Sequence, residues 1–347
     1  MGFIMKNKGA ALITVLLIVF IVMAIITNMT VKNYRVIKKL TNQKIETQAY
    51  SILFTAIDLA RAGLLTSGAT SKIDTLTDLW AQPIPKTSLL ENIDMSGQIF
   101  DEQGKFNVND LVINGNINRK AINQLSTLLG YLSIPTSLAS SIAYYMAAPK
   151  YQSDIMSQYS TGNPAYRPSG RPLIDLSELM LVKGMRADWV YKLSFYLTAI
   201  PQPYSSYAIG YSKESNSQED KKNQTSPPIT DSTGMLININ TASAEVIAAK
   251  SGIPLSIAQR AVASRNDKPF KTNEDITKFL RNNGIIASQD NGQNNINIDP
   301  STLTTQSSYF TVHAVVDSGN YQFKWIALLY RNDRNGQWPK ILWQHPE

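Results

Sequence analysis

Few residues in this chain are of a type that could carry out catalysis. The 347 residues include two histidines, His313 and His345, and no cysteine. Neither histidine has a carboxylate or a nucleophile at the spacing of a catalytic motif, and the sequence lacks the phosphate-loop, dinucleotide, serine-elbow and zinc-protease fingerprints. Without cysteine there are no disulfides and no thiolate metal sites. The sequence therefore predicts a protein that is not an enzyme and requires no cofactor.

Three aspartates are of a type that could bind a hard cation. Asp101, Asp299 and Asp317 each lie near the end of an expected strand. Clustered carboxylate oxygens are the ligands that Ca²⁺ prefers, but aspartate at strand ends more often forms turns. These residues are weak metal-site candidates, and the sequence does not decide between the two roles.

A phosphate-binding helical hairpin is the other chemistry that the sequence suggests. Residues 251–265, SGIPLSIAQRAVASR, resemble a helix-hairpin-helix, whose Gly-hydrophobic-Gly turn presents N–H groups to a DNA phosphate. Here Pro254 occupies the third turn position and has no N–H to donate. The net charge of +7 is also spread along the chain. We predict no nucleic-acid partner; a membrane-anchored DNA-binding or uptake protein is the alternative.

The hairpin belongs to an internal repeat of predicted helices. Three pairs of segments match in the same order: FNVN (106–109) with ININ (237–240), IPTSLASSIA (134–143) with IPLSIAQRAV (253–262), and RPLIDLSEL (171–179) with KPFKTNEDI (268–276). Ordered self-similarity of this kind indicates a duplicated supersecondary unit. The unit resembles a SAM-like fold that presents a protein-binding surface. The polar stretch 201–234 between the copies has the composition of a mobile linker.

Strand patterns flank the repeat on both sides. Residues 99–108 are predicted to form a hairpin around a DEQG turn, and residues 309–316, 321–331 and 339–344 a C-terminal antiparallel meander. Residues 66–97 are expected to be mixed loop and short elements, because Pro83 and Pro85 block regular structure. A long helix with an antiparallel sheet is an α+β fold.

The N-terminal segment is long and apolar enough to cross a membrane. Ala10 to Val31 contains 22 uncharged residues, about 33 Å of helix against a hydrocarbon core of about 30 Å. Helical spacing continues without proline to about Gly63. A secretory signal peptide is disfavoured because its apolar core is usually only about 7–15 residues long. A plain single-pass anchor is the other alternative.

The sequence KNKG followed by AALITVLLIVF resembles a prepilin leader. The resemblance implies that prepilin peptidase cuts between Gly9 and Ala10 and that Ala10 is N-methylated. Most pilins have Glu at the fifth mature position, where it neutralises the amino terminus of a neighbouring subunit. This chain has Thr14 there, which implies a subunit with no neighbour stacked above it, at a filament tip.

The charges next to the apolar segment conflict with this orientation. Lys6 and Lys8 precede it, but four basic residues follow it closely, namely Lys32, Arg35, Lys38 and Lys39. The positive-inside rule alone would place the body of the protein in the cytoplasm. We give more weight to the leader motif, which places the body in the periplasm.

The combined pattern resembles the general secretion pathway protein K family, minor pseudopilins of the bacterial type II secretion system. FDEQGKFNVNDL, IDLSELMLVKGM, LININTASAEVIAA and YFTVHAVV carry the resemblance together with the leader. It implies a pilin fold with a large inserted all-α domain of two SAM-like units. The expected divisions are a leader (1–9), a transmembrane part (10–31), a pilin domain (32–110), a helical insert (111–298) and C-terminal pilin strands (299–347).

The same resemblance implies the function, partners and location. The protein would form the tip of the periplasmic pseudopilus with the I and J pseudopilins, and with H and the major pseudopilin as further partners. It would be anchored in the inner membrane before assembly and would support export of folded proteins. Some members bind calcium. A type IV minor pilin shares the leader and is an alternative. Four residues of the long helix are candidates for partner contacts: Leu40, Ile45, Ile52 and Leu53.

Overall fold

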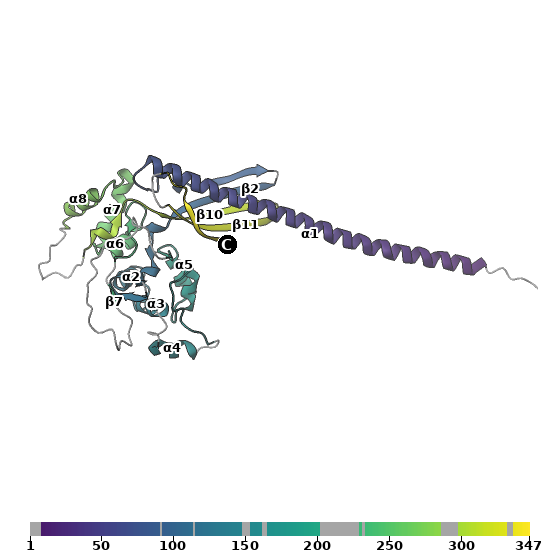
Figure 1. Ribbon diagram of the computed structural model, residues 1–347, viewed down its shortest axis with the longest axis horizontal. Coiled ribbons are helices and arrows are strands. Elements are labelled where there is room, and N and C mark those ends of the chain that lie inside the picture. The colour runs from purple at the N-terminus through teal and green to yellow at the C-terminus, as the bar shows by residue number, and fades with distance from the viewer. Residues whose placement is uncertain are drawn as a thin grey trace, which may run out of the picture.

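One helix dominates the shape of the molecule. In the computed structural model, helix α1 spans Lys8–Thr70. The structure describes residues 8–90, 92–113, 115–147, 153–161, 165–201, 229–230, 233–285, 298–331 and 336–347. Helix α1, with 63 residues, extends over about 95 Å at about 1.5 Å per residue. It projects as a bare rod from a compact head (Figure 1). It continues past Gly63 because Leu64, one turn from Ala60, is still buried against the sheet.

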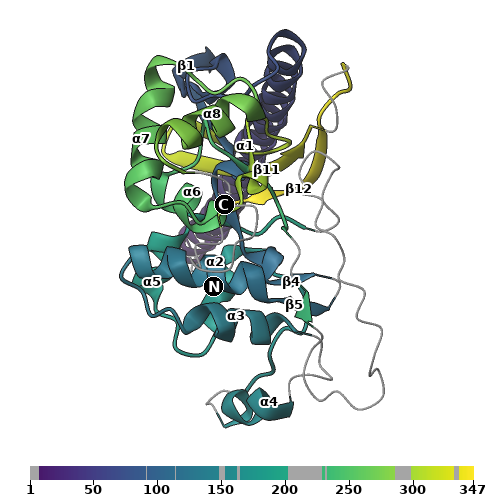
Figure 2. The same cartoon turned by 90° about the vertical axis from the view of Figure 1, so that its left-hand side faces the viewer.

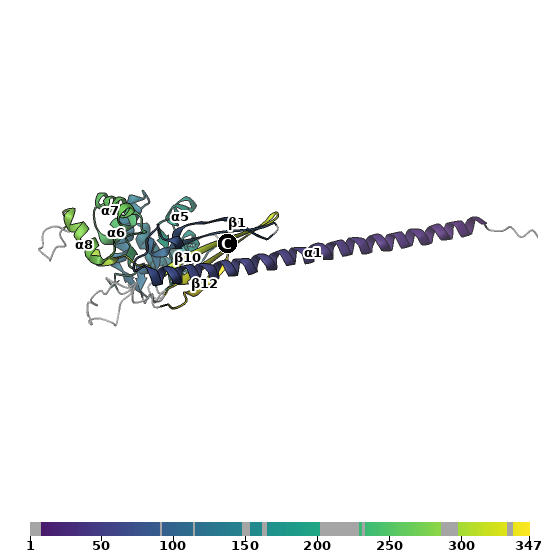
Figure 3. The same ribbon diagram turned by 90° about the horizontal axis from the view of Figure 1, so that it is seen from above.

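A five-stranded antiparallel sheet packs on the distal part of α1. Its order is β1-β2-β10-β11-β12, with β1 at Ile84–Leu90, β2 at Ile93–Asp101, β10 at Tyr309–Ser318, β11 at Tyr321–Tyr330 and β12 at Lys340–Pro346. Figure 3 shows α1 running along this sheet and on beyond it. The C-terminal meander is confirmed. The expectation that Pro85 blocks regular structure is wrong, because Pro85 lies in β1, an edge strand, where proline can be accommodated.

The predicted hairpin at residues 99–108 is also wrong. β2 pairs instead with β10, so that Asp101 lies opposite Phe310. After Asp101 the chain turns sharply, because the Asp101 carboxylate accepts a hydrogen bond from the backbone N–H of Gln103. The chain thus leaves the sheet at Asp101 and returns at Tyr309. Residues 102–308 lie between these two neighbouring strands, whereas the sequence placed the insert at 111–298.

The insert is mainly helical. Its helices are α2 (Arg119–Tyr131), α3 (Leu138–Met146), α4 (Ser153–Ser160), α5 (Ala187–Leu193), α6 (Ala244–Ser251), α7 (Leu255–Asp267) and α8 (Asn273–Asn282). Short strands connect them: β3 (Phe106–Asn107), β4 (Val112–Ile113), β5 (Asn116–Asn118), β6 (Leu197–Thr198), β7 (Ile229–Thr230), β8 (Ile237–Asn238) and β9 (Leu303–Thr304). Viewed from the end of the head, α6–α8 and α2–α5 form two neighbouring groups (Figure 2).

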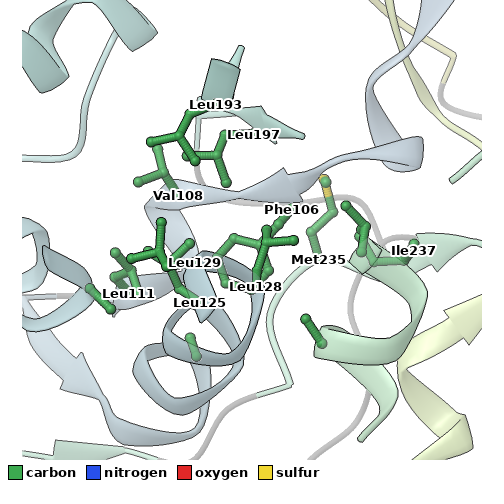
Figure 4. Packing of buried hydrophobic residues seen from close by; sticks show 14 of the residues in the cluster. Phe106, Val108, Leu111, Leu125, Leu128, Leu129, Leu193, Leu197, Met235 and Ile237 are labelled. Carbon is green, nitrogen blue, oxygen red and sulfur yellow. The ribbon is translucent and has the colours of Figure 1, made fainter. Parts of the chain in front are cut away.

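Two apolar cores hold the head together. One lies between α1 and the sheet and includes Leu53, Ile57 and Phe310. The other fills the insert, where Phe106 lies near Leu128 and Met235 (Figure 4). Phe106 and Met235 come from the two copies of the repeat, so the copies share one core. Most of the predicted linker, residues 202–228 and 231–232, lies outside the described residues.

Candidate assembly site

The proximal half of α1 extends beyond the head (Figure 1). Residues 12–44 are exposed throughout and include large apolar side chains such as Phe20 and Ile25. By length and composition, α1 is the one helix among the described residues able to cross a membrane. Gly9 and Ala10 fall in its first turn, and Thr14 follows one turn later. Residues 1–7 of the predicted leader lie outside the described part of the chain.

Beyond this segment, α1 has one buried and one exposed face. Ala49, Leu53 and Ala60 pack on the sheet, whereas Leu40 is 60% exposed. Among the predicted partner contacts, Leu53 is therefore wrong: it is 0% exposed because it packs in the protein's own core. Ile45 and Ile52 are partly buried, and Ile52 packs against the same core.

The structure adds two apolar residues to the outward face. Phe54 and Leu59 are 43% and 56% exposed. The sequence analysis missed them because it selected apolar residues by helical spacing without knowing which face the sheet covers. With Leu40 they form the exposed apolar face of α1; Phe54 lies at the edge of this face, where its ring contacts Trp325 of β11 at 5.3 Å between centroids.

The insert contains two copies of one hydrogen-bonded brace. In the first copy, the side chain of Asn109 accepts from the N–H of Leu173 and donates to its carbonyl, at 2.8 and 2.9 Å. In the second, Asn240 makes the same two bonds to Phe270, both at 2.9 Å. In both pairs the braced residue follows a Lys-Pro or Arg-Pro dipeptide. The two predicted copies therefore share this hydrogen-bond geometry.

Other features recur at equivalent positions. A capping box of Asp175 and Glu178 begins the third helical segment of the first copy, and one of Thr272 and Asp275 begins α8. Two-residue parallel pairings, β3 with β6 and β8 with β9, close the two units. The turn before the second helix has positive φ in both copies, at Ser133 and Gly252.

We expect Asn240→Ala and Asn109→Ala to lower the free energy of unfolding by similar amounts. Each substitution strands one buried backbone N–H and one C=O, and an unsatisfied buried group costs about 1–3 kcal/mol. For two such groups the loss should be about 2–6 kcal/mol for either variant, measured by urea unfolding of the full chain in detergent micelles. Asn273→Ala, an exposed residue in α8, is the control. A loss for one brace alone would contradict their equivalence.

A buried polar network joins the insert to the sheet and to α1. Arg331, directly after β11, donates to both carboxylate oxygens of Asp74 at 2.7 Å, and it also donates to the carbonyls of Leu64 and Ser307. The Asp101 carboxylate accepts from Ser307, Thr241 and Asn238. Asn238 and Thr241 belong to the second repeat. The network therefore fixes the insert relative to the sheet and to the end of α1.

This network makes stability depend on pH. Burial raises the pKa of Asp101 to about 6, against hydrogen bonds that act to lower it. Because the folded pKa lies above the unfolded value of 3.8, folding binds a proton between these values, and the contribution of Asp101 to stability falls as pH rises from about 4 to about 6. We expect the stability difference between wild type and Asp101→Asn to change over this window in urea unfolding at pH 4, 5, 6 and 7. A constant difference would contradict this assignment.

The three candidate metal aspartates do not form a common site. Asp101 is at one end of the β2–β10 pair, and Asp317, opposite Asp94, is at the other. Asp317 pairs with Lys86 at 2.8 Å, and Asp299 pairs with Lys120 of α2 at 2.5 Å. Within the described residues there is no group of three or more His, Cys, Asp or Glu side chains able to hold an ion. These aspartates do not fit a calcium site, since each is already bonded within the protein.

The two repeats are also joined by a buried ion pair. Lys250 of α6 lies 2.8 Å from Asp110 of the first copy, and both side chains are 0% exposed. Asp110 additionally accepts from the backbone N–H of Met235. Gln124 of α2 donates to the carbonyl of Lys250 at 2.6 Å. These bonds hold the two units in one fixed arrangement.

A long helix with an exposed apolar half, laid along an antiparallel sheet, defines a pilin-like filament subunit, here enlarged by a duplicated helical insert. The family description "Type II secretion system (T2SS), protein K" matches residues 104–202 and 237–296. The chain belongs to the type II secretion system protein K family. It is accordingly a minor pseudopilin of that system, a structural subunit and not an enzyme.

One curated protein is similar to this chain in sequence, and one solved structure is similar to it in fold. The "Type II secretion system protein K" of Pseudomonas aeruginosa is 28% identical over 288 residues, which cover 79% of this chain and 77% of the relative. A chain of "The Crystal Structure of the GspK-GspI-GspJ complex from enterotoxigenic Escherichia coli Type 2 Secretion System" has the same fold. The match has a TM-score of 0.66 at 19% identity and covers 89% of this chain and 99% of the other.

Proposed function

We propose that this chain forms the tip of the periplasmic pseudopilus, together with the I and J pseudopilins, and so supports export of folded proteins across the outer membrane. One observation carries the proposal: the insert is attached at the end of the sheet farthest from the exposed half of α1 (Figure 1). A subunit stacked above would have to fit around this bulk. Thr14 in place of the usual Glu supports the same position.

The I and J subunits are proposed as partners because the structurally similar chain was solved in a complex with them. The exposed apolar face of α1, with Leu40, Phe54 and Leu59, is the surface that fits neighbouring pilin helices. The SAM-like character of the two helical units belongs to the same proposal, as a second surface for protein partners. H and the major pseudopilin would be further contacts below the tip.

Copurification with I and J tests the proposal. The full chain, coexpressed with both and extracted in detergent, should yield a complex with one copy of each subunit by native mass spectrometry. Leu40→Glu with Leu59→Glu should weaken it by at least about tenfold, which is about 1.4 kcal/mol. Leu79→Glu, at an exposed apolar position outside α1 and outside the insert, should not. Incorporation of many copies along the pseudopilus shaft would overturn the tip assignment.

We further expect Gly9→Ala to block leader removal. The resemblance to a prepilin leader implies that the peptidase requires Gly before the cut, since a Cβ at that position would intrude on the bond to be cleaved. Intact mass spectrometry should show wild type beginning at a methylated Ala10 and the variant retaining all nine leader residues. Ala11→Gly is the control. A variant that is still processed to Ala10 would contradict the leader assignment.

A further inference from the structure

The first 45 residues of the chain contain no acidic residue: Glu46 is the first. Directly after the uncharged segment come Lys32, Arg35, Lys38 and Lys39, all exposed on α1. They occupy about 10 Å of helix beyond the expected membrane boundary. That is close to the distance of about 8 Å over which charges act at physiological ionic strength. None of the four forms an ion pair with the described part of the chain. We call these four residues the basic belt.

The basic belt lies on one particular face of α1. Eighteen residues are five full helical turns, so positions that far apart share a face. Arg35, Lys38 and Lys39 are in phase with Leu53, Ala56 and Ile57, which pack on the sheet. Lys32 is in phase with Tyr50, which packs against the same core. The basic belt therefore continues the face that the head covers further along.

The apolar side chains of this segment face the other way. By the same phase, Val36 matches Phe54 and Leu40 matches Asp58, both of which are exposed. Because the outward face is apolar, it suits other pilin helices and leaves the basic belt uncovered by them. About 17 residues, or about 26 Å, separate Val31 from Ala49, the first α1 residue of the core against the sheet. The basic belt thus lies on the part of α1 between the uncharged segment and the head.

We propose that the basic belt binds anionic phospholipid headgroups of the leaflet on the side of the head, and that this contact holds the subunit at a fixed depth before assembly. A flexible ammonium or guanidinium group beside a bilayer is attracted to phosphate-bearing headgroups, and several such groups act together. The inference rests on the proposed membrane anchorage of α1. It also accounts for a cluster of positive charge on the side that the positive-inside rule disfavours.

Lipid selectivity around the reconstituted full chain tests the proposal. Because the sequence has no cysteine, Asn33→Cys gives a unique site for a fluorescent donor. Energy transfer to headgroup-labelled phosphatidylglycerol is compared with transfer to identically labelled phosphatidylcholine in mixed vesicles. We expect phosphatidylglycerol to be enriched several-fold near the dye at low salt. The enrichment should fall to near unity in 1 M salt, where charges act over only about 3 Å.

The neutralised variant Lys32→Gln, Arg35→Gln, Lys38→Gln, Lys39→Gln should lose the enrichment. A control variant of equal net charge, with Gln at the exposed head positions Lys268, Lys271, Lys278 and Arg281, should retain it. Unchanged enrichment in the belt variant would overturn the proposal. If the belt variant keeps the lipid enrichment but no longer copurifies with I and J, the belt binds protein and not lipid. Failure of the full chain to float with either kind of vesicle would instead refute the membrane anchorage.

Discussion

Asp110→Ala should lower the free energy of unfolding by about 3–5 kcal/mol, the usual cost of breaking a buried ion pair. The substitution leaves the ammonium group of Lys250 buried without its carboxylate and removes the acceptor of the Met235 N–H. The side chain of Asp110 also fills space that a Cβ at Gly234 would occupy. Urea unfolding of the full chain in detergent micelles, followed by tryptophan fluorescence, measures the loss.

The charge itself can be separated from the packing. The double variant Asp110→Asn, Lys250→Met keeps the shapes of both side chains and an acceptor for the Met235 N–H, but it buries no charge. It should therefore recover most of the stability that Asp110→Asn or Lys250→Met loses alone. Lys120→Met removes the Lys120–Asp299 pair, in which both side chains are more than 25% exposed. It should cost about 1 kcal/mol or less. Equal losses for Lys120→Met and Lys250→Met would contradict the importance of burial.

Arg331→Met should lower the free energy of unfolding about as much as Asp110→Ala does. Arg331 lies at the junction between α1, the sheet and the insert. Asp74 would lose its bidentate partner, and the carbonyls of Leu64 and Ser307 would lose a donor. Because the Arg331 and Asp74 side chains are 2% and 0% exposed, we expect a loss of about 3–5 kcal/mol.

The matched control is Arg186→Met. Arg186 pairs with Asp188, but both side chains are about 60% exposed, so the loss should be about 1 kcal/mol or less. Limited proteolysis provides a second measurement: in Arg331→Met, cleavage should increase near Asp74 and Ser307, where the segments meet. If Arg331→Met is no less stable than Arg186→Met, the junction does not depend on this pair.

Periodic and local signals in the sequence were sufficient for much of this fold. The uncharged run and helical spacing predicted α1, since helix formation depends on residues three and four apart. The C-terminal meander followed from alternating strands around a short turn. The matched segments of the repeat predicted equivalent units. The two asparagine braces explain why these segments match in sequence. Asn109 and Asn240 form hydrogen bonds with equivalent backbone groups in the two copies.

Contacts between distant segments could not be predicted in this way. Asp101 suggested a hairpin turn, but it ends β2 and pairs across to Phe310, more than 200 residues later. Leu53 and Phe54 are adjacent apolar residues on a helix, and only the position of the sheet makes one a core residue and the other an exposed one. The three aspartates were weak metal-site candidates in the sequence, and only the structure shows which side chains each of them bonds.

The sequence by itself determined that this protein has a helix long and apolar enough to span a membrane and a repeated helical pattern, and it predicted a prepilin-like leader, because each of these depends on local composition and spacing. Only the tertiary structure decided which face of that helix remains available for other subunits and where the insert is attached. It also decided which charges are paired. Those properties depend on the docking of segments far apart in the chain, which local periodicity does not encode.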